Sequence, residues 1–420
     1  MTITRPPEAP RPSIVEEPPD VYAPPDVDAQ EALIEEARRR ARRRRRMWYA
    51  ASALALGVIA LAVFGFGHRG GGGAGAARQS GESAAPAPAP ISRLPARANG
   101  VLTIEDRNRS DVINADTLSV VSPDGSGLRP LTRCQPRPGC LFRSYAWSPD
   151  GKRLAFLSGR MGGVITVSNL FLSVVNADGT DQRRLARCGN CDPFQNLSWS
   201  PDSRRIVFAT PNLHIVSVVT GAQRQLKVSG VNPVWSPAGT TIAFGFAGAL
   251  FSIRPDGSGM AQIASVDGVA GHPAWSPDGT RIAFDTPDDL YVVDADGSHL
   301  KLLLASPPAN GPGYPSWSPR GNLILFETTP VTAGGFAAEV WVVKPDGSGQ
   351  RRLYRSQCCG LWSPPIWSPD GTAIAVGASV YDANGITNDG ILIMDPQGKH
   401  RRRVFGNPEA IAWQPLPLAP

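Results

Sequence analysis

From about residue 100 onward, apolar and polar residues alternate in short runs, and each run ends at a turn rich in Pro, Asp and Gly. The runs "RIAF" at 281 and "LYVVD" at 290 are typical, and the turn "SPDG" precedes the first of them. A period of two is the pattern of a β-strand that buries one face. Pro presets φ in such turns and Gly accepts a positive φ. This part of the chain is therefore predicted to form short antiparallel strands.

The strands belong to a repeated unit. The segment "AWSPDGTRIAF" at 274 has close copies at 146, 198, 234, 316 and 366, and a weak copy, "AWQPLPLA", at 412. Successive copies lie 36 to 52 residues apart, which is the spacing of a propeller or solenoid unit. The tryptophans of the motif are Trp147, Trp199, Trp235, Trp275, Trp317, Trp367 and Trp413.

A second motif follows each first one and consists of an apolar strand, a D-G turn and another strand, as in "VWVVKPDGSGQRRLY" at 340. Each repeat therefore supplies four strands, which is the blade of a β-propeller. The chain is predicted to be an all-β, seven-bladed propeller over residues 100–420, and the C-terminal strand is predicted to complete the first blade. The motif aspartate is architectural rather than catalytic, because Ala238 and Arg320 replace it without disturbing the repeat.

The W-S-P-D-G repeats resemble the WD40-like repeats of the TolB propeller family, and the resemblance covers residues 100–420. It implies a propeller fold and, for the family, a role in the cell envelope. Two features differ from the family pattern. TolB carries an α/β domain before a six-bladed propeller, whereas this chain has no such domain and seven predicted blades.

The first hundred residues predict a membrane tether. Residues 1–29 read as a disordered Pro-rich tail, 30–46 as an Arg-rich helix, 47–67 as a transmembrane helix and 68–99 as a Gly/Ala/Pro linker. The positive-inside rule places the arginines in the cytoplasm at an anionic membrane surface and the propeller outside. The alternative of a cleaved signal depends on the small residues at 74–77. The arginines are Arg38, Arg39, Arg40, Arg42, Arg43, Arg44, Arg45 and Arg46.

Charge argues against a nucleic-acid partner. The whole chain has a net charge of +6, but residues 100–420 hold 28 basic and 26 acidic residues and are close to neutral. A nucleic-acid-binding domain carries a basic patch or stripe instead. The partner is therefore expected to be a protein, a peptide or another component of the envelope.

The irregular loops, which connect the second strand to the third and one blade to the next, are predicted to share one face of the propeller. Function tends to reside on such loops. The residues three positions before the motif tryptophans are expected near the channel mouth, and a polar group among them, with one nearby aromatic residue, is the candidate binding site. The alternative is an ordinary polar lining with bound water. The candidates are Asn196, Asn232, His272, Tyr314 and Trp362.

All six cysteines fall on predicted blade-to-blade loops: Cys134, Cys140, Cys188, Cys191, Cys358 and Cys359. An even number in an extracytoplasmic domain favours disulfides. A zinc site built from the first four is the alternative. No spacing of His, Ser or acidic residues matches a catalytic motif, so neither a cofactor nor a metal is expected. The sequence favours a non-enzymatic binding propeller, and the alternative is a propeller hydrolase or lyase that acts on a cell-wall or imported saccharide.

Overall fold

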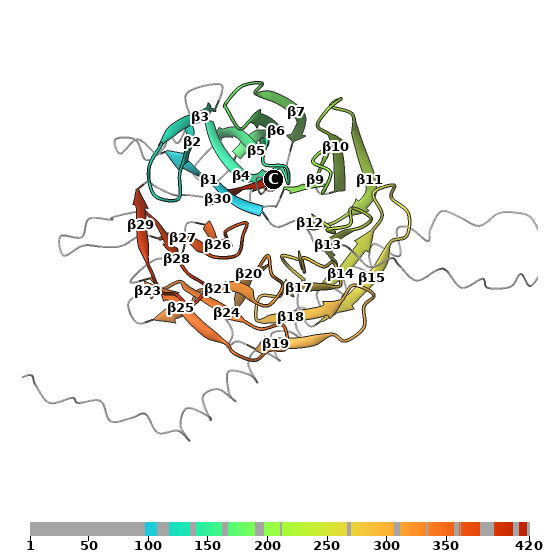
Figure 1. Cartoon of the computed structure of the whole chain (residues 1–420). Coiled ribbons are helices and arrows are strands. Elements are labelled where there is room, and N and C mark those ends of the chain that lie inside the picture. Colours follow the sequence, from blue (N-terminus) through green and yellow to red (C-terminus); the bar gives the residue numbers. More distant parts are fainter. Residues whose placement is uncertain are drawn as a thin grey trace, which may run out of the picture. The chain divides into compact units, whose positions relative to one another are not determined.

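The computed structural model shows a ring of four-stranded antiparallel sheets (Figure 1). It describes residues 97–106, 117–134, 140–161, 167–189, 197–210, 212–266, 270–305, 311–332, 335–356, 361, 363–378, 390–405 and 411–417. The predicted tail, Arg-rich helix and transmembrane helix lie outside these residues, as does the linker up to residue 96. In the part of the chain that is described, no helix has the length and apolar character needed to span a membrane.

The sheets form seven blades, numbered here along the chain. Blade one contains β30 (Ile411–Pro417), β1 (Arg97–Asp106), β2 (Thr117–Val121) and β3 (Arg129–Arg133). Blade two contains β4 (Cys140–Trp147), β5 (Arg153–Met161), β6 (Val167–Asn176) and β7 (Arg183–Gly189). Blade three contains β8 (Ser198–Trp199), β9 (Arg205–Thr210), β10 (Asn212–Ser217) and β11 (Gln223–Ser229). Blade four contains β12 (Val231–Trp235), β13 (Ile242–Phe246), β14 (Ala249–Ile253) and β15 (Ala261–Ser265).

The remaining three blades follow the same order. Blade five contains β16 (Ala274–Trp275), β17 (Arg281–Asp285), β18 (Asp289–Asp294) and β19 (Lys301–Ala305). Blade six contains β20 (Pro312–Trp317), β21 (Ile324–Thr328), β24 (Glu339–Val343) and β25 (Arg351–Arg355). A small hairpin, β22 (Val331–Thr332) and β23 (Gly335–Phe336), lies within the predicted long loop of this blade. Blade seven contains β26 (Ser363–Trp367), β27 (Ile374–Ala378), β28 (Gly390–Met394) and β29 (Arg402–Phe405).

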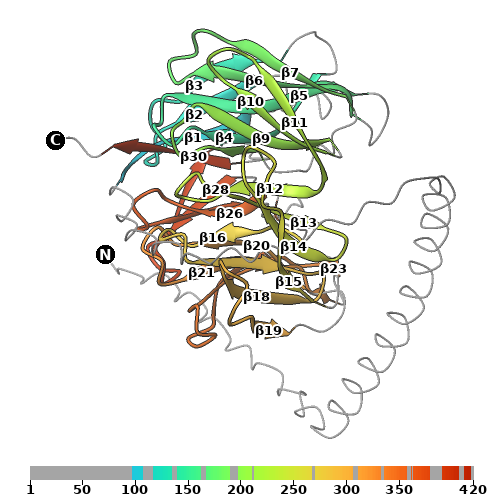
Figure 2. The ribbon, with the colours of Figure 1, turned by 90° about the vertical axis from the view of Figure 1, so that its right-hand side faces the viewer.

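The ring closes through the two ends of the described chain. Strand β30 pairs antiparallel with β1, with Trp413 opposite Leu102 (Figure 2). The first strand of each blade contacts the first strand of the next, all the way round from β30 to β26 and back to β30. This pairing fastens the last described strand of the chain into the first blade. The predicted seven-bladed propeller with its C-terminal closing strand is therefore confirmed.

The motif tryptophans join neighbouring blades. The indole N–H of Trp317 donates to the carbonyl of Ala274, at 3.0 Å, and Ala274 directly precedes Trp275 of the preceding blade. Trp199 makes the equivalent bond to Ala146 at 2.9 Å. Because the acceptor is a backbone carbonyl, the residue before each tryptophan can vary. The repeated tryptophan is therefore explained by packing between blades and needs no catalytic role.

The motif serine and aspartate hold the turn itself. The Ser148 hydroxyl donates to Asp150 and accepts the backbone N–H of Arg153, at 2.5 and 2.9 Å. In blade six, where arginine replaces the aspartate, Asn322 accepts the hydroxyl proton of Ser318 at 2.9 Å. The turn therefore survives substitution of its acid, as the sequence indicated.

Seven apolar clusters, one between each pair of adjacent blades, form the core of the described residues. The second strand of most blades contributes one phenylalanine that is almost completely buried. Burial of a phenylalanine side chain contributes about 1.5–3 kcal/mol. These residues anchor the inner part of each blade and fix the position of the residue that follows them. They are Phe156, Phe208, Phe244, Phe284 and Phe326.

Candidate binding site at blades five and six

The strand order places two kinds of connection on opposite faces of the propeller. Successive antiparallel strands put the W-S-P-D-G and D-G turns on one face, called here the turn face. The connections from second to third strand and from blade to blade lie on the other, called here the loop face. The site described below consists of His272, Asp285, Tyr314 and Glu327, lies at the loop face and is called the blade 5–6 site.

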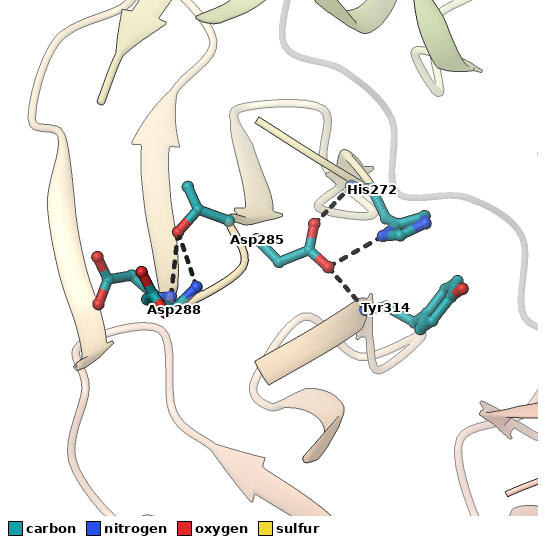
Figure 3. A network of polar contacts seen from close by, with 6 residues as sticks. His272, Asp285, Asp288 and Tyr314 are labelled. Carbon is teal, nitrogen blue, oxygen red and sulfur yellow. Dashed lines mark hydrogen bonds and ion pairs between the residues drawn. The ribbon is translucent and has the colours of Figure 1, made fainter. Parts of the chain in front are cut away.

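Asp285 is the centre of the site (Figure 3). It is the last residue of β17, and only 5% of its surface is exposed. Its carboxylate accepts the backbone N–H of His272 at 2.5 Å and that of Tyr314 at 3.0 Å. The Nδ1 of His272 lies 2.9 Å from the same carboxylate. Because a carboxylate only accepts, Nδ1 of the ring is the donor of this bond. Asp285 therefore joins the loop before β16 to the first strand of blade six.

The turn that follows Asp285 is also fixed by a side chain. The Thr286 hydroxyl accepts the backbone N–H of Asp289 at 3.0 Å and that of Asp288 at 3.4 Å (Figure 3). A threonine that binds the backbone two and three residues ahead forms a compact turn. This turn holds the end of β17, and with it the carboxylate of Asp285, in one position.

His272 and Tyr314 form an aromatic pair beside this carboxylate. Their ring centroids are 3.9 Å apart and the ring planes are inclined by 30°. Tyr314 has φ of 54°, a conformation that is rare for a residue with a bulky side chain. The register between β20 and β21 shifts between Gly313 and Ser316, so Tyr314 lies in a β-bulge. Bulges and strained residues are common where a side chain is aimed at a ligand.

Glu327 lies on β21, opposite Gly313 on β20. Its Oε2 is buried and has no hydrogen-bond partner among the described residues. Burial raises the pKa of this carboxyl to about 7, the nearby charge of His272 lowers it, and the charge of Asp285 raises it further. Glu327 is therefore close to half protonated at neutral pH, whereas an exposed glutamate would be fully ionised.

Two glycines make room for the acids. A Cβ on Gly271 would lie 2.2 Å from Oδ1 of Asp285, so only glycine allows this close approach. A Cβ on Gly313 would lie 3.6 Å from Oδ2 of Asp285 and 4.0 Å from Cγ of Glu327. The absent side chain of Gly313 therefore leaves a space that is bordered by the carboxylate of Asp285 and the Cγ methylene of Glu327.

The structure brings together two of the predicted candidates, His272 and Tyr314. Asn232 is a residue of β12 in blade four, nine-tenths buried, with φ of 49° in a comparable bulge. The other predicted site residues lie outside the described residues, so their roles stay predictions. They are Asn196, Trp362 and the eight arginines at 38–46.

Sequence reasoning missed the two acids. Asp285 and Glu327 follow the buried Phe284 and Phe326 of their blades. In four other blades the same position holds an apolar residue or glycine. In blade one it holds Glu105, whose side chain is not among those that the structure describes. An acid directly after an apolar run in a buried strand was the available signal. The residues at the equivalent position in these four blades are Leu157, Ala209, Gly245 and Gly377.

Cys134 and Cys188 are buried and each forms a disulfide bond. The side chains of Cys140, Cys191, Cys358 and Cys359 lie outside the described residues. Among the residues that are described, no three His, Cys, Asp or Glu side chains are arranged to hold a metal ion.

No protein-family model and no curated protein matches the sequence. Solved structures share its fold. An oligogalacturonate lyase from Vibrio parahaemolyticus aligns over 73% of this chain and 85% of its own, with 16% identity and a TM-score of 0.50. A prolyl endopeptidase aligns over 78% of this chain and 50% of its own, with 13% identity and a TM-score of 0.52. TolB from Acinetobacter baumannii aligns over 71% and 78%, with 15% identity and a TM-score of 0.45.

At these identities the likeness concerns the fold alone. The propeller that the TolB-type repeats implied is present, with seven blades. A lyase and a peptidase share this fold, so the fold does not select a function. The function therefore has to be inferred from the chemistry of the site.

Proposed function

We propose that this protein is a membrane-tethered, non-enzymatic propeller that binds a protein or another envelope component through its loop face. The observation that carries the proposal is Oε2 of Glu327, which is buried, has no hydrogen-bond partner among the described residues and lies within the electrostatic reach of His272. A buried polar atom without a partner costs about 1–3 kcal/mol. An unpaired buried atom of this kind is most readily tolerated where a ligand supplies the missing partner.

The surroundings of Glu327 support a binding role. Asp285 is engaged by three N–H groups, two from His272 in the loop before β16 and one from Tyr314 in β20, so the site is held in place before a ligand arrives. Preorganisation of this kind reduces the entropy lost on binding. Tyr314 adds a strained residue in a bulge on the same face. These features coincide at one place on the loop face, where an irregular connection meets the rigid inner strands.

The tether is part of the proposal and depends on the sequence alone. Residues 47–67 are apolar for long enough to cross a bilayer, and eight arginines precede them. The Gly/Ala/Pro-rich segment up to residue 96 would then separate the membrane from the propeller. This arrangement would present the loop face to other envelope components.

The test is cross-linking in cells that express the tagged full chain, followed by affinity capture and mass spectrometry. The variant bait carries His272→Ala and Tyr314→Ala, and the matched control carries His299→Ala, an exposed histidine on the turn face. The proposal expects one partner to be enriched by the wild type and by the control and lost from the double variant. Equal capture by all three baits, or no specific capture, would refute a binding role for this site.

A second function is favoured by one specific observation. A carboxyl with a pKa of about 7 beside a histidine is suited to general acid or base catalysis at neutral pH. This agrees with a lyase or hydrolase that acts on a saccharide. The test is incubation of the full chain with neutral and uronic-acid oligosaccharides, with and without divalent cations. Product formation that Glu327→Gln abolishes would favour the enzyme over the binding module.

A further inference from the structure

The two acids of the blade 5–6 site differ in how they are hydrogen-bonded. The two backbone N–H groups and the ring N–H that point into the site already bind Asp285. Oε2 of Glu327 is buried and has no hydrogen-bond partner among the described residues. A ligand that satisfies this site must therefore bring donors.

We propose that the blade 5–6 site binds an organic cation, an ammonium or guanidinium group on a flexible chain, with Oε2 of Glu327 as its acceptor and the His272–Tyr314 pair as an aromatic wall. The inference rests on the proposed function and specifies the chemistry of the bound partner. Lysine and arginine side chains of a peptide carry these groups.

Charge distinguishes a cation from other donors. The side chains of Asp285 and Glu327 border the same space beside Gly313, so ionised acids there attract a cation and repel an anion. A cation also gains from the face of an aromatic ring, by about 0.5–2 kcal/mol. The charge is an organic one rather than a metal ion, because no three ligating side chains converge among the described residues.

Binding of a cation is expected to depend on pH. A cation stabilises ionised Glu327, so it lowers the pKa of the carboxyl and releases a proton wherever Glu327 was protonated. The titratable groups whose charges act on this carboxyl are His272 and Asp285. With a pKa of about 7, affinity should rise about tenfold between pH 6 and pH 8.

The experiment is calorimetric titration of the detergent-solubilised full chain at pH 6, 7 and 8. The probes are Nα-acetyl-lysine amide and Nα-acetyl-arginine amide, with Nα-acetyl-norleucine amide as the uncharged analogue. Two buffers of different ionisation enthalpy report the protons released. We expect at least one cation to bind more tightly than the analogue, with affinity about tenfold higher at pH 8 than at pH 6 and release of about half a proton at pH 7.

Two variants separate the site from general charge effects. Glu327→Gln keeps the shape but cannot ionise, so it should lose both the preference for cations and the proton release. Glu339→Gln removes another buried acid of the same blade, which is paired with Arg352 at 2.7 Å, and should retain both. Equal affinity for charged and neutral probes, or an unchanged pH dependence in Glu327→Gln, would overturn the inference. If cross-linked capture still depends on His272 and Tyr314, the proposed function survives that result.

Discussion

Replacement of Glu327 by glutamine should stabilise the propeller at pH 8 and have little effect on its stability at pH 4.5. The pKa of Glu327 is about 7 in the folded protein, against an ordinary value of 4.5. One pKa unit corresponds to about 1.4 kcal/mol, so ionised Glu327 costs the folded state about 3 kcal/mol. Below pH 4.5 the carboxyl is protonated in both states and this cost is absent. The cost grows as pH rises from 4.5 to 7 and is complete above 7.

Thermal unfolding of the full chain at pH 4.5, 6, 7 and 8 tests this expectation. The entropy of unfolding is about 2 cal/mol/K per residue, so about 3 kcal/mol corresponds to a rise of roughly 5 °C in the Tm of the variant at pH 8. Glu339→Gln serves as the control. It removes the negative charge that is paired with Arg352, so it should lower the Tm at pH 8. A Glu327→Gln variant that is less stable at pH 8, or whose Tm differs from the wild type equally at all pH values, would refute the reasoning.

Three further changes test the scaffold and the site. Gly271→Ala places a Cβ 2.2 Å from Asp285 and should cost about 1–3 kcal/mol, whereas Gly313→Ala meets only ordinary contacts and should weaken cation binding at unchanged Tm. Trp317→Phe loses the bond to Ala274 and should cost about 1–3 kcal/mol more than Trp235→Phe, because the buried Trp235 indole N–H has no partner among the described residues. Deletion of residues 411–417 removes β30 and should abolish cooperative unfolding in calorimetry. Equal losses within either matched pair, or a single sharp transition after the deletion, would contradict these arguments.

The sequence predicted the site only in part, and the reason is the range of the contacts involved. His272 and Tyr314 were found because both stand three residues before a motif tryptophan, and the repeat places such residues on one face. Asp285 and Glu327 were missed because each ends a strand whose other residues are apolar, and a single acid there does not reveal whether it has a partner. Their importance follows from contacts with the neighbouring blade.

The fold of this protein was determined by local sequence. The alternation of apolar and polar residues, the S-P-D-G and D-G turns and the spacing of the tryptophans specify strands, blades and their number, because each depends on neighbours a few residues away or on the next copy of the repeat. Tertiary structure alone decided the chemistry of the site. Burial raised the pKa of Glu327, and the loop before β16 and strand β20 together gave Asp285 its three donors. The exposure of a side chain to water and the charges that act on it depend on all the residues packed around it, and those residues are distant in the chain.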